Sequence, residues 1–193
     1  MFKKNMFIMS VASAALLSAS AFAAIGDESR VDNIKWIADI TTQSMTGTLI
    51  VTDVNGNLVQ AGHEFDLGRV DNELKFEQNH GGPAILQART WTDSTTEGVQ
   101  GKVEPSEIAA TTTNATWVIN SAKYDVISGG AITNTGVVPT VYVDGTSATI
   151  GSTAATGKGE IRVTLEQTTA PTIPVENVSK AVVTLSISAK EDA

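Results

Sequence analysis

The sequence contains no cysteine and only two histidines among its 193 residues. Without thiolates it offers no cysteine nucleophile, no thiolate zinc site, no redox motif and no lipid-carrying cysteine. A Gly-x-Ser-x-Gly turn, a phosphate-binding loop and a basic patch are also missing. We therefore predict that the chain is not an enzyme and needs no cofactor.

The few residues that resemble a metal or acid–base site have a structural explanation. His63 adjoins an alternating run, and His80 begins the turn sequence His-Gly-Gly-Pro, so both are predicted to be surface residues rather than metal ligands. Asp53-Val-Asn55-Gly-Asn57 is similar to the start of a calcium loop. It lacks the later bidentate acid and lies between two expected strands, which favours a hairpin turn.

Aromatic residues are scarce, and the three tryptophans are dispersed. Trp36, Trp91 and Trp117 each fall inside an expected strand, which favours core packing over a sugar-stacking cleft. A glycosidase-like carboxylate pair has no local signature, although 21 acidic residues permit one by number alone. An envelope hydrolase built on such a pair stays open as a third function.

Basic residues are outnumbered by acids, and the formal net charge is −8. Two of the 13 basic residues lie in the expected leader, so the remainder carries a net charge of −10. This charge argues against nucleic acid and anionic membrane surfaces as partners. It favours a soluble surface.

Residues 1–23 have the pattern of a secretory signal peptide. Lys3 and Lys4 precede an apolar run from Met6 to Leu17, and Ala21 and Ala23 form a small-residue exit. Serines interrupt the run, which is too short for a membrane-spanning helix. We expect cleavage before Ala24, export through the periplasm, and no membrane insertion of the remaining chain.

The remaining sequence predicts an all-β protein. Runs rich in Thr, Val, Ala and Ile alternate in polarity and are separated by Gly, Asn, Asp and Pro. We expect one immunoglobulin-like β-sandwich over residues 42–193. The expected strands are 34–41, 47–53, 58–60, 64–67, 74–78, 85–92, 98–103, 115–119, 123–127, 137–143, 147–150, 159–166 and 181–189.

Turns and loops are expected where this alternation stops. Asn55-Gly56 and Asp144-Gly145 predict two hairpin turns. Residues 128–136 and 151–158 are rich in Gly, Ser, Thr and Ala and are expected to be loops. Pro105 to Ala110 predicts at most a single helical turn.

The two ends of the secreted chain differ from an ordinary sandwich. A polar stretch, 24–33, precedes the alternating run at Ile34, and the long strand 181–189 is followed only by Lys-Glu-Asp-Ala. With the export signal and the segment Phe65-Asp-Leu-Gly-Arg-Val70, this pattern resembles the chaperone–usher fimbrial subunits, or pilins. The chain lacks the cysteine pair and penultimate tyrosine of many type 1-like subunits, which points to a cysteine-free branch or another family.

The resemblance implies a sandwich that lacks one strand and is completed by another molecule. A periplasmic chaperone and then the N-terminal extension of an identical or related subunit would fill the groove, at an outer-membrane usher, by strand addition. The product would be an adhesive fimbria on the cell surface. The donor would lie within residues 24–41, with Ile34, Trp36, Ala38 and Ile40 as inserting side chains and Val183, Leu185 and Ile187 lining the acceptor groove.

Two interpretations remain open from the sequence. Residues 34–41 can be a donor strand or the first strand of the sandwich itself. The chain can correspondingly be a fimbrial structural subunit, or a self-contained secreted β-sandwich that binds carbohydrate or protein. A host receptor cannot be assigned from these residues.

Overall fold

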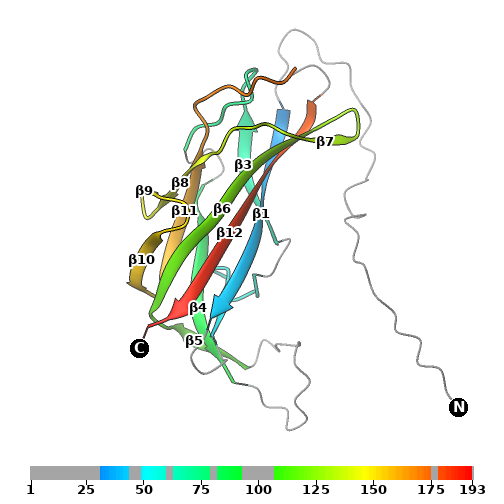
Figure 1. Cartoon of the computed structure of the whole chain (residues 1–193). Helices are drawn as coiled ribbons and strands as arrows, with labels where there is room; N and C mark the ends of the chain where they lie inside the picture. The colour runs from blue at the N-terminus through cyan, green and yellow to red at the C-terminus, as the bar shows by residue number, and fades with distance from the viewer. Residues whose placement is uncertain are drawn as a thin grey trace, which may run out of the picture.

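The computed structural model describes residues 31–43, 49–59, 63–78, 82–92, 107–174 and 178–192, with residues 31–43 and 67–69 described by their backbone. This part of the chain contains no α-helix and is built of β-strands (Figure 1). The strands are β1 (Val31–Gln43), β2 (Leu49–Thr52), β3 (His63–Val70), β4 (Ala84–Trp91), β5 (Ile108–Thr112), β6 (Ala115–Ser128), β7 (Ala131–Asn134), β8 (Thr140–Val143), β9 (Thr146–Ala148), β10 (Thr153–Lys158), β11 (Glu160–Glu166) and β12 (Val178–Glu191).

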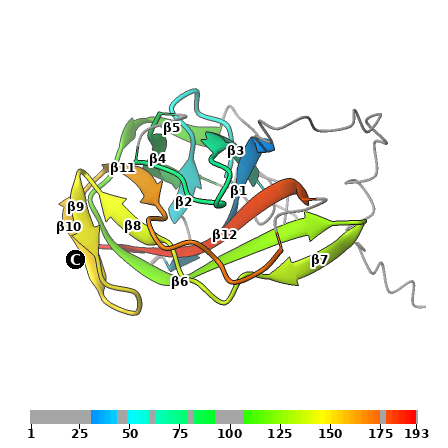
Figure 2. The same ribbon diagram turned by 90° about the horizontal axis from the view of Figure 1, so that it is seen from above.

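The strands form two sheets that face each other (Figure 2). The first sheet has the order β10-β6-β12-β1-β3, with β7 added beside β6. The second has the order β2-β4-β11-β8-β9, with β5 added beside β4. The expectation of an all-β sandwich is confirmed at this level.

The core lies between the sheets and follows the period-two alternation of the strands. In β11, Ile161 and Val163 are fully buried while Arg162 between them is exposed. Each fully buried aliphatic side chain contributes about 1.5–3 kcal/mol by leaving water. Trp117 of β6 is fully buried, and its indole N–H donates to the carbonyl of Lys158 at 2.8 Å. Trp91 is half-buried instead, and its indole donates to the Glu107 carboxylate at 3.0 Å.

The two predicted hairpin turns are present. Asp144 and Gly145 both have positive φ, 50° and 79°, and join β8 to β9 as a two-residue turn. This geometry matches the right-handed strand twist. At the other turn, the Asp53 carboxylate accepts the backbone N–H groups of Asn55 and Asn57 at 2.8 and 2.9 Å.

Several local predictions were wrong. Two expected loops contain β7 and β10, and Ile108–Ala110, expected to be helical, belongs to β5. The Gly129-Gly130 turn, with both φ values positive, lets β7 fold back on β6, so pairing overrides low apolar content. Conversely, residues 74–78 form a turn with only an isolated bridge at Phe76, because the Asp71 carboxylate binds the N–H groups of Glu73 and Lys75.

Candidate functional site

The first described strand, β1, lies between the C-terminal strand β12 and β3 (Figure 1). It runs parallel to β12 and antiparallel to β3. The positions predicted to insert into a groove of another subunit therefore lie in a sheet of their own chain. They pair there with β12, the strand predicted to line that groove. The register pairs Ile34 with Ala181, Trp36 with Val183, Ala38 with Leu185 and Ile40 with Ile187.

The β12 residues at this register point into the core. Val183, Leu185 and Ile187 are each 0% exposed, whereas Thr184 and Ser186 between them are half-buried on the opposite face. Alternate apolar side chains along one strand are what a neighbouring strand needs for a defined register, because a one-residue slip would reverse its faces. The side chains of β1 itself are outside the described part of the structure.

The pairing of β1 with β12 differs from the other strand pairings that the structure describes. It is parallel, and the others are antiparallel. Parallel ladders are slightly less stable per residue than antiparallel ones. The chain continues from Gln43 through residues 44–48 to Leu49 in the second sheet. The strand β1 is thus connected to the rest of the described fold through one short segment.

On its other side β1 borders β3, which contains the Phe65–Val70 segment of the sequence resemblance. Trp36 pairs with Phe65 and Ala38 with His63, and the register shifts on both sides of Ile34. The His63 and Phe65 rings lie 4.8 Å apart and are tilted by 51°. His63 is therefore a half-buried strand residue beside an aromatic ring.

The opposite side of β12 is held by β6, and Tyr124 anchors that strand. Its hydroxyl is buried and donates to the carbonyl of Leu74 at 2.9 Å, across 50 residues of sequence. Phe76 meets its ring edge-on at 5.6 Å between centroids. Burial, with a smaller effect of the nearby Asp71 charge, raises the pKa of Tyr124, so the phenol is neutral.

The end of β12 is tied to two neighbouring strands by Asp192. Its carboxylate accepts the Thr116 hydroxyl at 2.6 Å and the Gly157 N–H at 2.9 Å. Its own N–H donates to the Asn114 carbonyl at 3.3 Å. These contacts join the end of β12 to the start of β6 and to the end of β10. The terminal Lys-Glu-Asp-Ala carried no sequence signal for this role, because the partners are distant in the chain.

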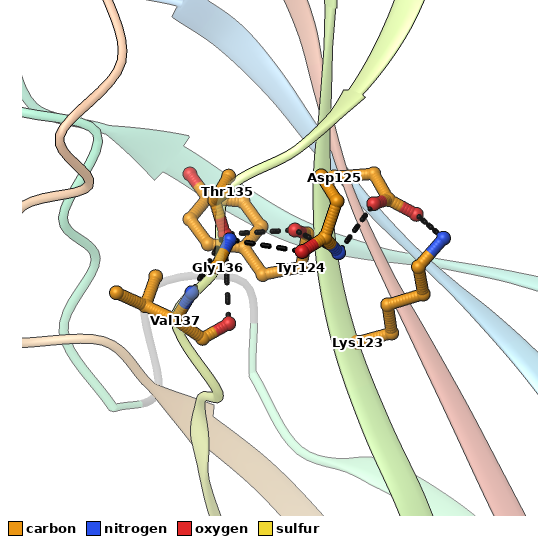
Figure 3. Close-up of polar contacts among 7 residues, drawn as sticks. Lys123, Tyr124, Asp125, Thr135, Gly136 and Val137 are labelled. Atoms are coloured by element: carbon orange, nitrogen blue, oxygen red, sulfur yellow. Dashed lines mark hydrogen bonds and ion pairs between the residues drawn. The ribbon is translucent and has the colours of Figure 1, made fainter.

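A polar cluster fixes the β7 hairpin to β6 (Figure 3). The Asp125 carboxylate is buried and accepts the side-chain N–H of Asn134 at 2.9 Å, while the Lys123 ammonium pairs with it at 2.8 Å. The Thr135 hydroxyl donates to the Tyr124 carbonyl at 2.8 Å. A buried charge is tolerated when it is paired and hydrogen-bonded. The cluster therefore has a structural explanation.

The possible metal ligands in the sequence were the two histidines, His63 and His80. Among the described residues no group of three or more His, Asp or Glu side chains is placed to hold a metal ion. The second histidine, His80, is outside the described residues. Burial opposes ionisation of Asp53, but hydrogen bonds from Asn57 and Asn55 outweigh it, so the pKa of this carboxyl lies below its usual value. In the described part of the chain no helix is long and apolar enough to span a membrane.

Comparison with known proteins adds no relative. No protein-family model, no curated protein and no solved structure matches this chain.

Proposed function

We propose that the chain is a fimbrial structural subunit that assembles by exchanging its N-terminal strand between molecules. The observation that carries this proposal is the position of β1. It is the first described strand, it lies between two strands that otherwise do not pair with each other, and it pairs with β12 at the register of the buried Val183, Leu185 and Ile187. The same strand from another copy would meet the same register positions.

Withdrawal of β1 would create a site for strand addition. The facing edges of β12 and β3 would lose their ladder partner, and the buried side chains Val183, Leu185 and Ile187 would meet water. An edge with unpaired N–H and C=O groups beside an apolar surface binds an extended peptide. A periplasmic chaperone strand, the usher-bound subunit and an identical or related subunit all supply such a peptide.

The direction of the inserted strand determines the form of the assembly. In the parallel direction the end of β1 lies beside the end of β12, where Gln43 pairs with Lys190. The chain's own β1 also ends at this end of the molecule, near the C-terminus (Figure 1). Exchange in that direction favours a closed pair. A donor that enters from the opposite end gives a linear fibre instead, and the period-two alternation permits this because it has no direction.

A disulfide lock between β1 and β12 tests the exchange in a chain that has no other thiol. Thr41 pairs with Ser188, on the face of β12 away from the buried Ile187. The variant T41C/S188C should close within one chain on oxidation, because paired strand positions lie within disulfide reach. We expect the oxidised protein to remain monomeric and the reduced protein to polymerise as the wild type does.

The two single variants provide the matched control. Neither T41C nor S188C alone can close within a chain, so both should polymerise under oxidising conditions. In their oxidised mixture, the disulfide between a T41C chain and an S188C chain reports parallel exchange, because this cross-link joins the two positions that pair in the β1–β12 register. Polymers formed equally well by the oxidised double variant would overturn the proposal.

A self-contained secreted binding module is the second candidate. It is favoured by the fact that β1 already pairs on both sides within its own chain, so this sheet is complete. A protein of this kind would stay monomeric with the lock open or closed. Its melting temperature would respond to a carbohydrate or protein ligand and not to added β1 peptide.

A further inference from the structure

We propose that the end of the sandwich at β7 is the surface against which the body of the next copy packs in a linear assembly. The proposal rests on the proposed strand exchange. This surface, the β7 pole, consists of the turn Gly129-Gly130, strand β7, the segment 135–139 and the segment 167–174. Thr140 pairs with Glu166, so the latter two segments lie side by side where they join β8 and β11.

The β7 pole lies at the end of the groove that faces away from the C-terminus. Ile34 near the start of β1 pairs with Ala181, and Ala181 pairs with Val126, close to the β6–β7 turn. Figure 1 shows β7 at the upper end of the molecule and the C-terminus at the lower end. A donor that enters in the reverse direction leaves the groove at the β7 pole. Its own sandwich must therefore lie against this end.

Among the described residues, the large apolar side chains with the highest exposed fractions lie at the β7 pole. Ile132 of β7 is 68% exposed and Val138 is 59% exposed, more than any other large apolar residue described. All four residues of β7 are exposed, and the strand pairs only with β6 in the described sheets. Apolar side chains beside a free strand edge are typical of a contact surface.

The charge pattern identifies a second copy as the occupant. No charged residue lies between Asp125 and Asp144, and none lies between Glu166 and Glu176. The chain as a whole carries a net charge of −8, so copies repel each other at most of the surface. The C-terminal end carries Lys190, Glu191 and Asp192. The segments of the β7 pole therefore carry no charge of their own that a like-charged molecule would bury unpaired, although the adjoining turn carries Asp71, Glu73 and Lys75.

Two double variants with the same added charge test the contact. I132D/V138D places two carboxylates at the β7 pole, and V54D/I150D places two at exposed apolar positions elsewhere, 54% and 38% exposed in the wild type. All four positions are exposed, so we expect both monomers to retain the wild-type melting temperature. Fibre elongation from wild-type seeds is measured by light scattering and electron microscopy of the secreted chain.

The expected result is a loss of about tenfold or more in elongation rate for I132D/V138D and a change within about twofold for V54D/I150D, since burying an unpaired carboxylate is costly. Closed-pair exchange in the T41C and S188C mixture should persist when I132D/V138D is added to both chains. Equal elongation of the two double variants would overturn the β7-pole contact alone. Failure of the wild-type chain to elongate, together with failure of the T41C and S188C chains to cross-link in their mixture, would overturn strand exchange and the contact together.

Discussion

The strand β12 has two neighbours that are held in very different ways. On one side β6 runs antiparallel to it from Val178 to Glu191, and on the other β1 runs parallel to it from Ile34 to Gln43. The β6 side is reinforced by Asp192, whose carboxylate accepts the Thr116 hydroxyl of β6. On the β1 side the structure describes the backbone ladders of β1 with β12 and β3.

Under the proposed exchange, the same buried face of β12 would serve a permanent partner, β6, and an exchangeable one, β1. Val183, Leu185 and Ile187 are buried in the core that β6 and the second sheet share with β12. Their burial is therefore required for folding. Their pairing with β1 requires only a strand with the same alternation of apolar residues. In the proposed exchange, stability and strand addition would depend on the same residues but on different edges of β12.

The largest expected effect comes from removing a side chain that serves both sides. Leu185→Ala should lower the free energy of unfolding by about 2–5 kcal/mol, because Leu185 is fully buried and leaves a cavity. Urea unfolding of residues 24–193 measures the change. Ser186→Ala, at the half-buried neighbouring position, is the control. Its free energy of unfolding should change by less than about 0.5 kcal/mol. Similar losses for the two variants would remove the distinction between the faces of β12.

Amide hydrogen exchange compares the two edges directly. The backbone N–H groups of β1 should exchange at least about a hundredfold faster than those of β6, because β1 can open alone while β6 opens only with the whole fold. Mass spectrometry of peptides covering Ile34–Gln43 and Trp117–Val126 measures both rates in one sample. Equal protection of the two strands would contradict an exchangeable β1. Reduced T41C/S188C should behave as the wild type, and its oxidised form should lose the difference.

Tyr124→Phe removes the hydrogen bond between β6 and the turn that follows β3. We expect a loss of about 1–3 kcal/mol, because the buried Leu74 carbonyl loses its donor. The raised pKa of Tyr124 stabilises the fold fully below the ordinary tyrosine value of about 10, and this contribution is lost as the pH rises through the folded pKa. The variant should therefore lose less stability than the wild type between pH 9 and about 11.

Tyr142→Phe is the matched control for that experiment, because Tyr142 is the other tyrosine and lies in the second sheet. Its hydroxyl donates to the Glu166 carboxylate at 2.6 Å, which raises its pKa without burial of the kind found at Tyr124. The melting temperature across the alkaline range measures both variants. If Tyr142→Phe, rather than Tyr124→Phe, reduced the loss of stability at alkaline pH, the effect would come from the second sheet and the prediction would be wrong.

The smallest effect is expected far from both edges of β12. Asp53→Ala should cost about 0.5–1 kcal/mol at pH 7, because the turn loses the acceptor for the N–H groups of Asn55 and Asn57. The lowered pKa of Asp53 stabilises the fold above the ordinary value of 3.8, and this contribution is lost as the pH falls through the folded pKa. The difference from wild type should shrink near pH 3 in thermal melts. Asp53→Asn, which keeps an oxygen acceptor, should lose less, and an unchanged hydrogen exchange rate of β1 is expected in both.

Strands with strong alternation were predictable, and those without it were not. The runs 159–166 and 181–189 correspond closely to β11 and β12, because one apolar face must be buried. In contrast β7 and β10 are strands through pairing with β6, and their sequences of small and polar residues carry no such pattern. The apolar run 74–78 became a turn because the Asp71 carboxylate satisfied the local N–H groups.

For the candidate site, the sequence predicted positions but no arrangement. The alternation marked Ile34, Trp36, Ala38 and Ile40, as well as the three β12 residues opposite them. Their pairing within one chain, and in parallel, depends on where β3 and β12 leave room for a strand, which no local pattern encodes. The contacts of Tyr124 and Asp192 escaped prediction for a similar reason, because each joins residues that are far apart in sequence.

The sequence by itself determined that this protein is built of strands, because period-two alternation and turn residues are local properties of the chain. It also determined the absence of thiol chemistry and the acidic surface. Only the tertiary structure decided which strands are neighbours, that β1 lies beside β12, and that uncharged segments meet at the β7 pole. Those relations depend on how two sheets bury one core, and this is a property of the whole chain rather than of any segment.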